Sequence, residues 1–162
     1  MNNSSKKAAY LGLGVALAMI LSYVELLIPP IFTAVPGIKM GLPNIAIIYI
    51  LYRMGFKSAF LVSVTRVLLV SLLFGNAMIM IYSLAGAILS IIAMAILKKL
   101  NLFSCVGISV CGGVLHNLAQ IVVAMILLEN AIIGYYMVVL AVSGTVSGVF
   151  VGLVGSKITK RF

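Results

Sequence analysis

The chain has 162 residues, of which 64% are hydrophobic and only 8% are charged, and its mean hydropathy is +1.32. A soluble domain carries roughly 25% charged residues, so this composition excludes a soluble fold and predicts an integral membrane protein. The formal net charge is +9. Because the basic residues lie singly or in pairs beside apolar runs, we attribute them to membrane orientation and expect a lipid bilayer, not a nucleic acid, as partner.

Six apolar runs predict membrane helices. A helix needs about 20 residues to cross a ~30 Å hydrocarbon core at 1.5 Å per residue. In the second run Pro43 interrupts the apolar stretch, and only Asn44 to Met54 is cleanly helical. We place Pro43 in the first turn of that helix, where its missing N–H is harmless. The sequence thus predicts an all-α polytopic protein with a single integral membrane domain over 1–162 and six transmembrane helices at about 8–28, 39–54, 57–74, 77–97, 106–128 and 131–156.

The charges predict how these helices are oriented. Nine of the eleven basic residues fall at the chain ends or in every second loop: Lys6, Lys7, Arg53, Lys57, Lys98, Lys99, Lys157, Lys160 and Arg161. Lys39 lies on the opposite side, where the two acids Glu25 and Glu129 also lie, and Arg66 lies inside a span. Short cytoplasmic loops are enriched in Lys and Arg, so both termini are predicted to be cytoplasmic.

The near-absence of acids restricts the chemistry. The chain has no aspartate and only two glutamates, Glu25 and Glu129, which lie at the ends of distant helices. Prenyl-chain synthases need aspartate-rich motifs, because Mg²⁺ prefers carboxylate oxygens. His116 has no second histidine or cysteine at ligand spacing, and no Walker A motif is present. We therefore expect no catalytic residue, no metal and no bound cofactor.

Several polar side chains lie within the predicted spans. Arg66 is nine residues from both Lys57 and Gly75, or roughly 13 Å from either end of its helix. His116 and Gln120 are four residues apart and share a helix face. Ionisable groups inside a bilayer are costly and normally face the protein interior or a cavity, which predicts a pocket in the outer half. Its candidate substrate-binding residues are Glu25, Lys39, Asn44, Arg66, Tyr82, His116, Asn117 and Gln120.

Two interpretations of these residues stay open on the sequence alone. Arg66, Lys39 and His116 against Glu25 give a net positive pocket, which favours a small anionic or phosphate-bearing ligand. Alternatively, Arg66 and Glu25 form a buried pair that specifies packing, and His116 with Asn117 bonds a neighbouring helix.

Small residues recur at four-residue intervals, which lets membrane helices approach closely. The first helix carries two such rows on different faces, which are Ala8, Gly12 and Ala16, and Gly14, Ala18 and Ser22. We predict that one row packs within the bundle and that the other contacts a partner helix. The last helix carries Gly144, Gly148 and Gly152, for which we predict packing within the bundle.

These features carry a resemblance. The small size, six spans, cytoplasmic termini and the row Ala8, Gly12 and Ala16 resemble the substrate-binding (S) component of an energy-coupling factor (ECF) transporter. Four segments are more particular: VPGIKMGLPN at 35–44, RMGFK at 53–57, Ser63-x-x-Arg66 and LHNLAQ at 115–120. They resemble the Gx transporter family, also called heptaprenyl diphosphate synthase component I, and the similarity covers nearly the whole chain.

The resemblance implies a substrate-binding subunit in a bacterial cell membrane. It would capture a small vitamin, cofactor or isoprenoid-related precursor in an outward-facing pocket closed by the loop after the first helix. Ala8, Gly12 and Ala16 would contact a transmembrane coupling subunit carrying two cytoplasmic ATPases, which supply the ATP hydrolysis. The alternatives are a non-catalytic membrane component of heptaprenyl diphosphate or menaquinone side-chain synthesis, and a small self-assembling channel.

Overall fold

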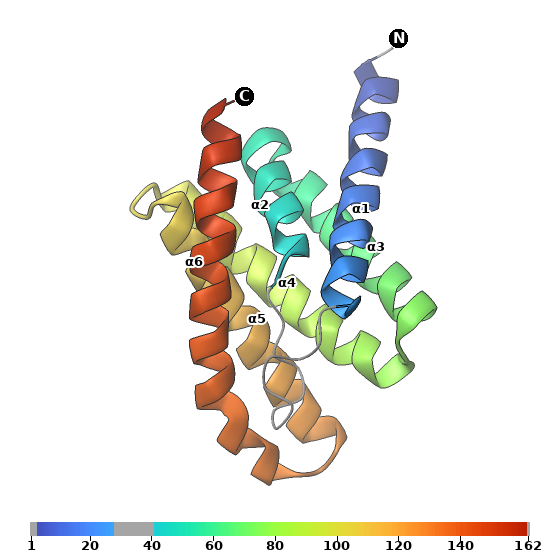
Figure 1. Cartoon of the computed structure of the whole chain (residues 1–162), viewed down its shortest axis with the longest axis vertical. Coiled ribbons are helices and arrows are strands. Elements are labelled where there is room, and N and C mark those ends of the chain that lie inside the picture. Colours follow the sequence, from blue (N-terminus) through green and yellow to red (C-terminus); the bar gives the residue numbers. More distant parts are fainter. Residues whose placement is uncertain (1–2, 28–40, 162) are drawn as a thin grey trace.

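The computed structural model describes residues 3–27 and 41–161, and its described part consists of helices without a strand (Figure 1). The elements are α1 (Asn3–Leu27), α2 (Pro43–Met54), α3 (Phe56–Phe74), α4 (Ala77–Leu100), α5 (Cys105–Leu127), the 3₁₀ helix η1 (Ala131–Tyr136) and α6 (Met137–Arg161). The prediction of an all-α multi-pass membrane protein is confirmed.

Of the helices in the described residues, five are long and apolar enough to cross a membrane. The exception is α2, whose 12 residues reach only about 18 Å at 1.5 Å per residue. The predicted span at 39–54 is therefore corrected to a short helix that begins at Pro43, in the first turn as expected, while 39–40 lie outside the described residues. The last predicted span, 131–156, is divided into η1 and α6, because its first six residues form the 3₁₀ helix.

The helices form two halves. In the first half, α1 packs against α2 and α3, and in the second half α5 packs closely against both α4 and α6. The halves meet where α3 contacts α4 and where α2 contacts α6 (Figure 1). The short helix α2 is the most enclosed element, since Ile47, Ile48 and Leu51 are each 1% exposed or less. Large apolar side chains on the outer faces of the longer helices are exposed, as lipid-facing residues are.

A glycine seam joins α5 to α6. A Cβ built at Gly144 would lie 2.8 Å from the Gly113 carbonyl oxygen, and one built at Gly148 would lie 2.5 Å from the Val110 Cα. At Gly152 the Cα of Val106 would be 2.6 Å away. Backbone therefore meets backbone along this seam, and the prediction that these glycines pack within the bundle is confirmed.

The two small-residue rows of α1 face different surroundings. In one row Ala18 is fully buried and Ser22 is 5% exposed, and a Cβ at Gly14 would meet Ile50 of α2. That row packs within the bundle. In the other row Ala8, Gly12 and Ala16 are exposed, and a Cβ at Gly12 would have nothing within 4 Å.

Both termini lie at the same end of the bundle (Figure 1). Near this end, the Lys98 ammonium in the last turn of α4 donates to the Leu51 carbonyl oxygen at 2.7 Å and lies 4.8 Å from the centre of the Tyr52 ring. A cation here satisfies terminal carbonyls of α2, which have no partner within that helix. Gly55 alone connects α2 to α3, and its positive φ of 83° is a conformation that glycine adopts readily.

Candidate ligand-binding site

A cavity of about 130 Å³ lies between the two halves of the bundle. The helices α1, α3, α4 and α5 each contribute one face to it, since their lining residues recur three or four positions apart. Two such sets are Arg66, Val70 and Phe74 on α3 and Gly113, His116 and Gln120 on α5. The remaining lining residues are Ser22, Glu25 and Leu26 of α1, Gly41, Pro43 and Asn44 at the start of α2, Val67, Ser71 and Gly75, Ile79 and Ser83 of α4, Asn117 of α5 and Ser147 of α6.

The first half supplies the charged end of the cavity. The Arg66 Nη1 donates to the Ser22 hydroxyl at 3.4 Å, and that hydroxyl donates to the Ala18 carbonyl oxygen at 2.8 Å. Glu25, one turn further along α1, accepts a hydrogen bond from the Gly41 backbone N–H and also interacts electrostatically with Arg66. Among the described residues, the Nε of this guanidinium is buried and has no hydrogen-bond partner. Because Arg66 lines the cavity, its guanidinium can donate to an acceptor that enters it.

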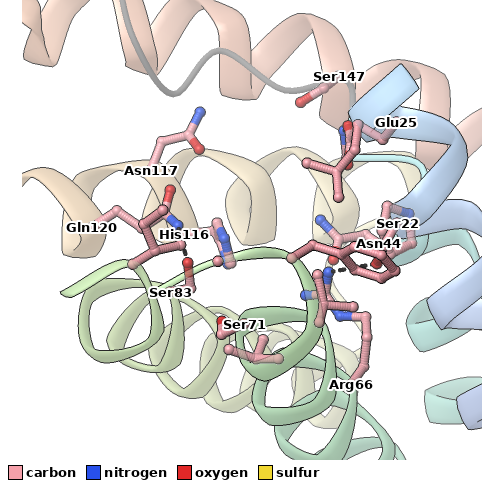
Figure 2. Close-up of a pocket in the computed structure, with 18 of the residues that line it drawn as sticks. Ser22, Glu25, Asn44, Arg66, Ser71, Ser83, His116, Asn117, Gln120 and Ser147 are labelled. Atoms are coloured by element: carbon pink, nitrogen blue, oxygen red, sulfur yellow. Dashed lines mark hydrogen bonds between the residues drawn. The ribbon is translucent and has the colours of Figure 1, made fainter. Parts of the chain in front are cut away.

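The second half supplies a set of amide, hydroxyl and imidazole groups (Figure 2). The Gln120 amide donates to the Ser83 hydroxyl at 3.2 Å, which links α5 to α4. The Asn117 amide donates to the Leu140 carbonyl oxygen at 2.8 Å, which links α5 to α6. These bonds hold the two side chains in place, and the carbonyl oxygen of each side-chain amide can still accept a hydrogen bond from a ligand.

Gly86 allows α4 to approach this part of α5. A Cβ built at Gly86 would lie 2.8 Å from both the His116 carbonyl oxygen and the Gln120 Cγ. Any larger residue at this position would therefore displace the helix turn that carries both side chains. The close approach places Ser83, which lies almost one turn earlier on α4, within hydrogen-bond distance of Gln120.

Apolar side chains also line the cavity. Leu26, Val67, Val70, Phe74 and Ile79 contribute to the lining. Beside them, the ring of Phe74 packs against Tyr23 with 5.4 Å between centroids, so that α1 and α3 close together at this side. The cavity therefore combines polar groups on two sides with apolar lining residues, as small-molecule sites commonly do.

A much smaller cavity adjoins the main one. Asn44, Gly113 and Ser147 line both, and the small cavity extends toward Ser90 and Ser109. Its volume of about 10 Å³ is close to the space that one water molecule needs. The four polar side chains around it offer enough hydrogen-bonding groups for a single water.

The cavity brings together six of the eight predicted pocket residues, which are Glu25, Asn44, Arg66, His116, Asn117 and Gln120. Tyr82 is not among the lining residues, whereas its neighbour Ser83 is, because successive side chains on a helix point about 100° apart. Lys39 lies outside the described residues. The described lining contains one arginine and one glutamate, whose formal charges balance, so the predicted positive excess stays a prediction.

None of the four serines in the described lining is among the predicted pocket residues, although Ser83 directly follows the predicted Tyr82. Ser22 lies three residues before Glu25, Ser71 lies five residues after Arg66, and Ser147 lies on α6. Helix spacing from Glu25 would have identified Ser22, whereas Ser71 is about 140° around the helix from Arg66 and is not found in this way. Ser147 carries no such signal, since it lies on a helix without a predicted pocket residue.

The donors around the cavity favour recognition of an organic ligand through hydrogen bonds and charge. Among the residues that the structure describes, no three histidine, cysteine, aspartate or glutamate side chains gather where they could hold a metal ion.

The family model described as heptaprenyl diphosphate synthase component I matches residues 15–158. This range contains all of the described cavity residues and the inner row of α1 from residue 15 onward. No curated protein and no solved structure matches the chain.

Proposed function

The chain belongs to the heptaprenyl diphosphate synthase component I family, and we propose that it is the substrate-binding (S) subunit of an ECF-type importer. In this role it captures a small vitamin, cofactor or isoprenoid-related precursor in the cavity between its two halves. We place it in a bacterial cell membrane with both termini in the cytoplasm.

The observation that carries this proposal is the cavity itself. Its described lining contains an arginine and a glutamate, and intramembrane ionisable residues normally mark binding sites or transport pathways. Glu25 lies near the C-terminal end of α1 and Asn44 at the start of α2, so the cavity lies toward the end of the bundle opposite the two termini. With the cationic end in the cytoplasm, the cavity faces the outside, where an importer meets its substrate.

We propose no catalytic role for the chain and no bound cofactor. Binding is the chemistry that its lining groups offer, since the carboxylate, guanidinium, amides and hydroxyls are arranged to hold polar atoms of a ligand. Transport against a gradient then requires energy from partner subunits, and we propose a transmembrane coupling subunit with cytoplasmic ATPases.

The exposed row of small residues on α1 supports the proposal that the coupling subunit contacts this helix. At about 100° per residue, Gly12 lies roughly 120° around the helix from the buried Ala18 and roughly 140° from Leu17. The helix thus has one face in the bundle, one face of small residues, and one face of large apolar residues exposed to lipid. A face of Ala8, Gly12 and Ala16 allows a second helix to approach closely.

Co-purification tests the partner. Tagged wild-type protein, isolated in mild detergent from its own cells, is expected to carry a membrane coupling protein and ATPases. Gly12→Leu is expected to lose them, because the added side chain holds a partner helix away, whereas Leu17→Phe on the lipid-facing side is the matched control and retains them. Retention of the ATPases by Gly12→Leu would contradict the proposed contact face, and their absence from the wild-type protein would contradict the importer.

Substrate retention tests the cavity. Small molecules that remain with the purified protein are identified by mass spectrometry for the wild type, for Arg66→Ala and for Arg53→Ala. Arg66→Ala is expected to insert normally and to lose the bound compound, because the cation of the cavity is gone. Arg53 lies in the last turn of α2, outside the cavity, and its variant is expected to behave like the wild type. Undiminished retention by Arg66→Ala would refute the site.

A second candidate function is favoured by the name of the family. It is a non-catalytic membrane component of prenyl diphosphate or quinone side-chain synthesis. The lack of aspartate argues for an accessory role in that pathway, since the catalytic magnesium would need carboxylates from another chain. The discriminating measurement is the product length and rate of a soluble prenyl synthase with and without this protein in vesicles.

A further inference from the structure

The two polar surfaces of the cavity lie on opposite sides of it. Figure 2 shows Arg66, Glu25, Ser22 and Asn44 together on one side, and Ser83, Gln120 and Asn117 together on the other. The first group comes from α1, α2 and α3, and the second from α4 and α5. A ligand that fills the cavity therefore meets polar groups at both of its ends.

The two surfaces differ in the groups they offer. Arg66 is a cation with several N–H donors, of which Nη1 contacts Ser22 while Nε is buried without a partner in the described structure. The opposite surface contains primary amides and a hydroxyl. Gln120 donates to the Ser83 oxygen, so the Ser83 hydroxyl hydrogen and the Gln120 carbonyl oxygen both remain for a ligand among the described contacts. Asn117 has likewise used one amide N–H on Leu140 and keeps its carbonyl oxygen.

We propose that the ligand of this cavity is polar at both ends. It presents a carboxylate or phosphate to Arg66 and a neutral group with both a donor and an acceptor, such as an amide or a heteroaromatic amide-like edge, to Gln120, Ser83 and Asn117. A short body joins the two and meets the remaining lining groups, which include the apolar Val67, Val70 and Ile79 and the polar His116 and Ser71. This inference rests on the proposed function, and it narrows the substrate class to compounds other than prenyl phosphates.

A prenyl phosphate fits only half of the cavity. Its phosphate matches Arg66, but its hydrocarbon end would displace water from Gln120, Ser83 and Asn117 without replacing any hydrogen bond. Buried polar groups left unpaired in this way oppose binding, and sites built to hydrogen-bond a ligand reject analogues that lack the group. The same groups favour a two-ended ligand, because each finds a partner.

Titration with isopentenyl diphosphate tests the inference, since this probe has one anionic end and one hydrocarbon end. The probe is added to the wild type, to Gln120→Leu and to Val122→Leu in lipid nanodiscs; Val122 lies on α5 and is 44% exposed on its outer face. We expect Gln120→Leu to bind the probe at least tenfold more tightly than the wild type, and Val122→Leu to match the wild type. The proposal of a two-ended ligand is overturned if the wild type and Gln120→Leu bind the probe equally well, which includes no binding to either. It is also overturned if Gln120→Leu binds the probe more weakly than the wild type.

Ser83→Ala provides a second variant that does not depend on the folding of Gln120→Leu. It removes the hydroxyl but keeps the helix, and it is expected to shift probe affinity in the same direction. Mass spectrometry of the compound retained by the wild type gives an independent answer, and a prenyl phosphate there would also overturn the inference. Neither measurement involves the ATPases, so a protein that holds a two-ended compound but has no ATPase partner would refute the importer and leave the ligand class standing.

Discussion

The substitution Gly148→Ala tests whether the α5–α6 seam holds the second half of the bundle together. The new Cβ would lie 2.5 Å from the Val110 Cα, 2.9 Å from the Ser109 carbonyl oxygen and 3.0 Å from the Val110 nitrogen. All three are backbone atoms, so no side chain can rotate away. The two helices must separate, and the contacts along the seam on either side of Gly148 weaken with them.

The expected size follows from two opposing effects. Overpacking a closely packed site destabilises by about 1–3 kcal/mol, and rigid backbone neighbours place Gly148 near the upper value. Alanine is favoured over glycine within a helix by about 0.8–1 kcal/mol, which offsets part of this. The net loss in the free energy of unfolding is therefore about 2 kcal/mol. For soluble chains of 150–250 residues, this lowers the melting temperature by about 4–8 °C.

Gly12→Ala is the matched control, because a Cβ at Gly12 has nothing within 4 Å. Only the helix preference acts there, so the variant is expected to gain about 0.5–1 kcal/mol. The assay is thermal unfolding of the detergent-solubilised protein without partner subunits, followed by the fraction that remains monodisperse after heating. If both variants changed stability equally, or if Gly148→Ala were the more stable, close backbone approach at the seam would be refuted.

Two further predictions concern the cationic end. Lys98→Met removes the hydrogen bond to the Leu51 carbonyl oxygen and the contact with the Tyr52 ring, and it should lower the free energy of unfolding by about 1–2 kcal/mol. The control is Lys99→Met at an exposed position, whose free energy of unfolding should stay within about 0.5 kcal/mol of the wild-type value. Equal losses in the two variants would show that Lys98 does not anchor α2. In a chain with Cys105 and Cys111 replaced by serine, a membrane-impermeant maleimide should label Asn130→Cys on intact cells and Lys99→Cys only after lysis. The opposite pattern would reverse the proposed orientation.

The long helices were predictable because hydropathy alone decides them. An apolar run of about 20 residues has few alternatives to a membrane helix, and the five long spans follow from this. The second run was harder to interpret, since its apolar residues continue through a turn. Pro43 and Gly41, with a φ of 69°, mark where the helix begins, and tertiary packing encloses the resulting short helix among its neighbours.

The cavity was predictable where charge and spacing coincided. Arg66, Glu25 and His116 are conspicuous in an apolar chain, and Gln120 follows His116 by one turn. Ser147 and Tyr82 show where charge and spacing fail to predict which residues line the cavity. Serine is common in membrane helices because its hydroxyl can bond a carbonyl of its own helix, as Ser147 does with Gly144 at 3.2 Å. Whether such a residue faces a cavity depends on helix rotation, which the periodicity of a uniformly apolar helix does not specify.

The position of α1 gives the proposal a mechanical consequence. Ser22 and Glu25 contact the charged end of the cavity, and Ala16, the nearest residue of the exposed row, lies six residues before Ser22, or roughly 9 Å along the same helix. A ligand that draws Arg66 away from Ser22 changes the contacts that hold the C-terminal end of α1 against α3. Since a helix of this length moves largely as a rigid element, the exposed row would shift with it. Ligand occupancy and partner affinity are then coupled in both directions, so an α1 variant that weakens partner binding without touching the cavity should also change the ligand affinity of the assembled complex.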